Sequence, residues 1–129
     1  MRDFTYSVVT PKSVDEAVAA VEQNTVANGF RVLHTHDVAA TLAEKGFQRE
    51  PLKIIEICNA RYAHEVLQRD VSTALMLPCP IVVYREGGQT HISTMLPSVI
   101  SDFYPGKGLE PLADLVQKVV LAIVDASAR

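Results

Sequence analysis

Two consecutive glycines, Gly87 and Gly88, separate the segments PIVVYRE and QTHISTML. Both segments are rich in β-branched and aromatic residues, which favour strands. Glycine reaches the positive φ values of a tight hairpin turn, so Gly-Gly between two such segments indicates a β-hairpin. We therefore expect consecutive antiparallel strands, and this expectation restricts the folds open to the chain.

Upstream of this hairpin, strand-like and helix-like segments alternate. Ser13 and Glu16 have the spacing of a capping box, and Gly29 is a suitable residue to end the helix that it starts. In the strand that follows, we expect Phe30, Val32, His34 and His36 on one face. The upstream predictions are strands at 4–9, 30–36 and 52–58, and helices at 13–28, at 38–46 after Asp37, and after Asn59.

Downstream, the apolar segment ALML precedes the hairpin, and we group it with the strands of the hairpin. Residues 97–108 are expected to form a loop with one helical turn. A long helix is predicted from Glu110. Its apolar face is broad, which indicates deep packing or contact with a second subunit. That face consists of Leu112, Leu115, Val116, Val119, Val120 and Ile123.

These elements predict an α+β fold with a mostly antiparallel, curved sheet of about 5–6 strands, helices packed on one face, and a long C-terminal helix. The 129 residues are expected to form a single domain, 1–129, large enough to bury its own core. No internal repeat or linker divides the chain.

Charge and composition narrow the function classes. The formal net charge is −3 and the basic residues are scattered, so no nucleic-acid partner is expected. No apolar run approaches the roughly 18 residues of a membrane span, and no secretory signal is evident, so we expect a cytoplasmic protein without membrane contact. In that compartment the two cysteines are expected to be free thiols.

The chain lacks the common nucleotide-binding, zinc-protease, disulfide-redox and hydrolase motifs, and its carboxylates form no evident pair. Cys58 ends a strand just before the helix capped by Asn59, where a helix dipole would lower its pKa. Cys79 stands between Pro78 and Pro80 at the start of another strand. If these strands are neighbours, both thiols open at one rim of the sheet; the alternative is that both pack as small apolar residues.

Two histidine patterns are compatible with a metal. His34 and His36 share a strand face, although no third ligand is identifiable, and an exposed sheet face carries such a pair equally well. His91 and Met95 lie four apart on one strand, and imidazole with thioether is an axial pair for haem or a copper site. Ordinary packing explains both patterns as well, and no cofactor is expected.

Three segments carry a family resemblance: EICNARYAHEVLQRD, LMLPCPIVVY and HISTMLP. With these motifs in this order, the chain resembles the domain of unknown function 302 family over nearly its whole length. It departs at Ala60, where the family usually has proline. The resemblance implies one copy of a TATA-box-binding-protein-like fold, commonly as a homodimer, and no established reaction. The matching positions are Cys58, Asn59, Pro78, Cys79, Met95 and Pro97.

Three hypotheses follow, and whether the chain is an enzyme stays open. The leading one is a homodimeric binding or interaction module with a small-ligand cleft near the ICN and LPC segments. The first alternative is a thiol-dependent redox or sulfur-handling protein that uses Cys58 or Cys79. The second is a metal or haem binder, through His91 and Met95 or through His34 and His36. The ligand-binding candidates are Cys58, Asn59, Cys79, His91 and Met95.

Overall fold

The computed structural model describes residues 3–129 and contains a five-stranded sheet in the order β1-β5-β4-β3-β2. All four neighbouring pairs are antiparallel, and a two-residue turn at Gly87 and Gly88 joins β4 to β5. The predicted α+β class is confirmed. The strands are β1 Thr5–Thr10, β2 Arg31–Asp37, β3 Leu52–Cys58, β4 Cys79–Glu86 and β5 Gln89–Met95.

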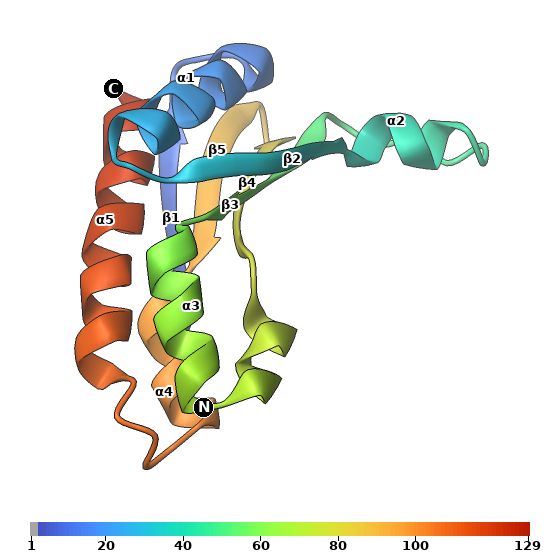
Figure 1. The fold of residues 1–129 in the computed structure, drawn as a ribbon. Helices are drawn as coiled ribbons and strands as arrows, with labels where there is room; N and C mark the ends of the chain where they lie inside the picture. The colour runs from blue at the N-terminus through green and yellow to red at the C-terminus, as the bar shows by residue number, and fades with distance from the viewer. Residues whose placement is uncertain (1–2) are drawn as a thin grey trace.

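The two longest helices, α1 and α5, pack beside each other against the sheet, while α3 and α4 lie beyond its end (Figure 1). No helix among the described residues is both long and apolar enough to cross a bilayer. The α-helices are α1 Val14–Ala27, α2 Val38–Ala43, α3 Ala60–Arg69, α4 Ile100–Phe103 and α5 Glu110–Ala128, and the 3-10 helices are η1 Val71–Met76 and η2 Pro97–Val99.

The ends of α1 are formed as predicted. Ser13 Oγ accepts a hydrogen bond from the Glu16 backbone N–H at 3.1 Å, and Glu16 Oε1 accepts one from the Ser13 N–H at 2.9 Å. At the other end Gly29 has a φ of 79°, and the Phe30 N–H donates to the Thr25 carbonyl. This reversal turns the chain so that Phe30 is buried in the core.

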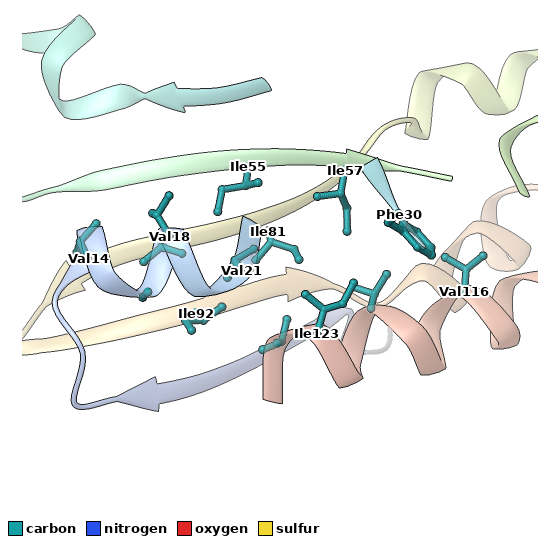
Figure 2. Packing of buried hydrophobic residues seen from close by; sticks show 14 residues of the cluster. Val14, Val18, Val21, Phe30, Ile55, Ile57, Ile81, Ile92, Val116 and Ile123 are labelled. Atoms are coloured by element: carbon teal, nitrogen blue, oxygen red, sulfur yellow. The ribbon is translucent and has the colours of Figure 1, made fainter. Parts of the chain in front are cut away.

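The core lies between the inner face of the sheet and the helices α1 and α5 (Figure 2). The apolar face of α5 is mostly buried within its own chain, because Val120 and Ile123 are fully covered. Leu115 alone among its large apolar residues is substantially exposed, at 47%. Of the two explanations for the broad face, deep packing therefore accounts for most of it. The core residues from the sheet are Ile55, Ile57, Ile81, Val83 and Ile92.

The predicted faces of β2 are wrong, because the strand contains a bulge between Val32 and His34. Val32 pairs with Ile57 and Thr35 pairs with Ile55, so these two residues face the helices. His34 and His36 lie on the opposite, open face. The extra residue shifts the alternation by one, so Phe30 and Val32 do not share a face with the histidines.

The segment ALML is not a strand, and the sheet has five strands, which agrees with the predicted number of about 5–6. It belongs to η1, where Asp70 caps the first turn by accepting a hydrogen bond from the Ser72 N–H at 2.9 Å. Thr73 Oγ1 donates to the Asp70 carbonyl at 2.7 Å and is fully buried. These local hydrogen bonds compete with strand pairing and hold the segment in a compact turn. The Leu77–Pro78 peptide bond that follows is cis.

One segment projects from the rest of the molecule. Helix α2 and residues 44–51 extend beyond the sheet, away from α5 (Figure 1). No residue of α2 is buried, and Phe47 is 65% exposed. We call residues 38–51 the arm. The arm contributes nothing to the core.

Candidate functional site

An apolar pocket lies where β3 ends and β4 begins, with a cavity volume of about 60 Å³. Four of the five predicted ligand-binding residues line it, whereas His91 does not. The pocket continues one end of the core, where Figure 2 shows Phe30, Ile57 and Val116. Its lining residues are Phe30, Ile57, Cys58, Asn59, Tyr62, Ala63, Val66, Met76, Leu77, Cys79, Pro80, Met95, Pro97, Val99, Ile100, Ala113 and Val116.

Strand pairing brings the two cysteines together. Ile57 of β3 pairs directly with Cys79 of β4, so Cys58 is one residue away from the partner of Cys79. Since neighbouring strands lie about 4.8 Å apart, the two residues are close neighbours at one rim of the sheet. Both are free thiols and both are partly buried.

Asn59 joins three parts of the pocket wall. Its Oδ1 accepts a hydrogen bond from the Tyr62 N–H at 3.1 Å and thereby caps α3. Its Nδ2 donates to the Gly29 carbonyl at 3.1 Å, next to the start of β2. The Tyr62 ring packs against the Phe30 ring with centroids 6.0 Å apart. Asn59 therefore fixes the direction in which α3 leaves the sheet.

The pKa values of both thiols are shifted upward. Burial raises the pKa of Cys58, and burial with the neighbouring Cys58 thiol raises the pKa of Cys79 to about 11. This direction is opposite to the lowering expected for Cys58 from the α3 dipole, because burial removes water that would stabilise the thiolate. Both groups are protonated at neutral pH, which does not favour a thiolate nucleophile.

We expect Cys79 to react with iodoacetamide on the order of a hundredfold more slowly than free cysteine at neutral pH, because thiolate is the reacting form. The rate should rise about tenfold per pH unit and level off only near the pKa of about 11. Mass spectrometry of tryptic peptides from the wild-type protein measures this rate at Cys79 separately from that at Cys58, because Arg61 and Arg69 lie between the two cysteines. A rate that levels off below about pH 8 would contradict the raised pKa.

Met76 is a pocket residue that the sequence did not reveal. It lies in η1, the segment expected among the strands, and that interpretation gave no reason to place it beside the cysteines. With Met76 included, every sulfur-bearing residue between positions 3 and 129 lines this one pocket. The four are Cys58, Met76, Cys79 and Met95.

His91 and Met95 are separated along β5. Four residues of extended strand span about 13 Å. The side chains of His91 and Met95 are therefore too far apart to bind one metal ion or one haem iron together. The His91 ring stacks on Tyr84 with centroids 5.0 Å apart, and its Nε2 lies 3.3 Å from the Glu86 carbonyl oxygen. The structure therefore places His91 against Tyr84 and Met95 at the pocket.

His34 and His36 do lie together on the open face of the sheet. Their ring centroids are 4.3 Å apart, and His36 Nε2 lies 3.0 Å from Glu56 Oε1. In the part of the chain that the structure describes, no three side chains of His, Cys, Asp or Glu are grouped so as to hold a metal ion. These two histidines are therefore not part of a recognisable metal centre of that kind.

A second depression, of about 530 Å³, lies between α3 and the start of α5. It is lined by polar residues of α3, including His64 and Arg69, and by Leu112 and Leu115 of α5. Sequence reasoning did not single it out. It is open and mixed in character, and none of the predicted ligand-binding residues lines it.

Comparison with known proteins identifies a family model and solved structures that are similar to this chain. Residues 6–127 match the family model described as domain of unknown function DUF302. The fold is also similar to the crystal structure of the uncharacterized conserved protein DUF302 from Bacillus stearothermophilus, with a TM-score of 0.92 and 30% sequence identity. That alignment covers 99% of this chain and 100% of the other. No curated protein matches.

Proposed function

The chain belongs to the DUF302 family, and from its pocket we propose that it is a noncatalytic binding module for a small ligand. The observation that carries the proposal is the apolar pocket beside the ICN, LPC and MLP segments. Its volume of about 60 Å³ is well below the roughly 300–1,000 Å³ of sites for drug-sized molecules. The proposed ligand therefore has only a few heavy atoms, and a haem is far too large.

The chemistry of the lining supports binding rather than catalysis. Among the lining residues in the described chain there is no carboxylate, imidazole or ammonium group, the usual general acids and bases. The side-chain amide of Asn59 is already used in two structural hydrogen bonds. The two thiols are protonated at neutral pH, so the thiol-dependent alternative has less support than simple binding.

Xenon, a single polarisable atom, tests whether the pocket admits a small guest. We expect the amide NMR signals of Cys58, Tyr62 and Met95 to shift as xenon is added. The shifts should reach a plateau once the pocket is filled. The Ala63→Leu variant, which fills the pocket, should reduce these shifts, whereas Ala19→Leu on the exposed surface of α1 should not. Equal shifts in wild type and in the Ala63→Leu variant would refute binding at this pocket.

We also propose that the module is a homodimer and that the arm covers a second copy. A six-residue helix is too short to be stable by itself in water, yet no side chain of α2 is more than partly buried in its own chain. Phe47 places a large apolar side chain in solvent on the same arm. A second copy that packs against the arm would supply the burial that the single chain does not.

At micromolar protein concentration, we expect the wild-type protein to be a dimer and the Phe47→Glu variant to be a single chain. The substitution places a charge in the proposed interface. Light scattering measures the mass. Val26→Glu is the matched control, since Val26 is 67% exposed on α1 and lies away from the arm. A wild-type protein with the mass of one chain would contradict the dimer, and a Phe47→Glu dimer would contradict the role of the arm.

A further inference from the structure

We propose that the small ligand is a soft monovalent metal ion, the cuprous ion, held by the sulfurs of the pocket. This inference rests on the proposed binding function and names its ligand class. The observation that carries it is the gathering of both cysteines and of Met76 and Met95, from three separate parts of the chain, around one small cavity. No other sulfur-bearing residue occurs between positions 3 and 129.

The backbone explains how these residues come together. Pairing of β3 with β4 places Cys79 opposite Ile57, and Cys58 is the next residue of β3. Helix η1 ends at Met76, only three residues before Cys79, and Met95 is the last residue of β5, which pairs with β4. The four residues therefore belong to the ends of adjoining elements at one rim of the sheet.

The donor types select the ion. Thiolate and thioether sulfurs are soft ligands and favour Cu(I), whereas Mg²⁺ and Ca²⁺ require several oxygen ligands. The pocket offers no carboxylate within the described chain, and the Asn59 amide is held by the Tyr62 N–H and the Gly29 carbonyl. Zinc is bound by Cys, His and carboxylate groups, and only two such side chains are present here.

The charge balance also suits a monovalent ion. Binding to one thiol forms a copper–sulfur bond and releases its proton, so that Cu⁺ and RSH give RS–Cu and H⁺. The product is neutral, and the thioethers of Met76 and Met95 add neutral donors. A neutral complex avoids the large cost of an unpaired charge in an apolar cavity. A divalent ion with one thiolate would keep a positive charge there.

Competition for Cu(I) against the chromophoric chelator bicinchoninate, in anaerobic solution with ascorbate, tests the proposal. We expect the wild-type protein to remove one equivalent of Cu(I) from the chelator and to release about one proton per ion. If wild-type protein leaves all the copper on the chelator, the inference is overturned. The xenon experiment then decides separately whether the binding function survives.

The variants Met76→Leu and Met95→Leu remove the thioethers and nearly preserve side-chain volume, so the fold should persist. The affinity of the double variant for Cu(I) is expected to fall by at least about 10–100-fold. A loss of this size already follows when a residue that only hydrogen-bonds to a metal ligand is replaced. The control variant His34→Ala/His36→Ala lies on the open face and should bind as wild type does. Unchanged affinity in the methionine variant, or an equal loss in the histidine control, would refute the four-sulfur site.

Discussion

Replacement of Ile57 by alanine is expected to lower the free energy of unfolding by about 3–4 kcal/mol. Ile57 is fully buried in β3, between Val32 of β2 and Cys79 of β4. The change removes apolar contacts and leaves space that neighbouring strands do not refill, because their backbones are fixed by the sheet. Urea denaturation followed by circular dichroism measures the loss.

The same change also alters the site, since Ile57 lines the pocket. The vacated volume should join the existing cavity, so the variant should bind xenon more strongly although it is less stable. Ile54→Ala is the matched control, because Ile54 lies in the same strand on the open face and is only partly buried. An equal loss of stability in the two variants would show that the covered face of the sheet is not the main core.

Replacement of Asn59 by alanine is expected to cost about 2–3 kcal/mol. Loss of the N-cap hydrogen bond to Tyr62 accounts for about 1 kcal/mol. The variant also loses the side-chain N–H that donates to the Gly29 carbonyl. This loss adds about 1–2 kcal/mol, the usual cost when a hydrogen-bonding group loses its partner. Thermal and urea unfolding measure the sum.

Asn59→Asp separates the two contributions. Aspartate keeps the capping oxygen for Tyr62 but has no donor for the Gly29 carbonyl, so its loss should lie below that of alanine. Asp37→Ala is a matched control: Asp37 also caps a helix, with its carboxylate 3.0 Å from the Ala40 N–H, but that helix is α2 on the arm. A cost for Asp37→Ala equal to that of Asn59→Ala would show that Asn59 acts as a cap alone.

The features that the sequence predicts correctly are those fixed by neighbouring residues. The Ser13 and Glu16 capping box, the Asn59 cap and the Gly-Gly hairpin each depend on hydrogen bonds or φ values within a few positions. Such local preferences operate whatever the rest of the chain does. The pairing of β3 with β4 is not of this kind: the sequence left it open, because α3 and η1 lie between the two strands in the chain.

In two of the three failures, distant parts of the chain decide the outcome. The bulge at Val32 is specified by the pairing of β2 with β3, so alternation alone placed Val32 and His34 on one face. The thiol pKa of Cys58 depends on how deeply α3 and η1 cover it, which no short pattern encodes. Met76 was missed because its segment was grouped with the strands, whereas Asp70 holds it in a 3-10 helix.

The arm has a consequence for how this domain tolerates change. Residues 43–51 bury no side chain, so a foreign peptide or a whole domain inserted there would leave the sheet and the pocket as they are. The proposed assembly surface and the proposed ligand site are thus at opposite ends of β3. Evolution or engineering can alter one without rebuilding the other, and a protease that cuts the arm would separate assembly from binding in a single step.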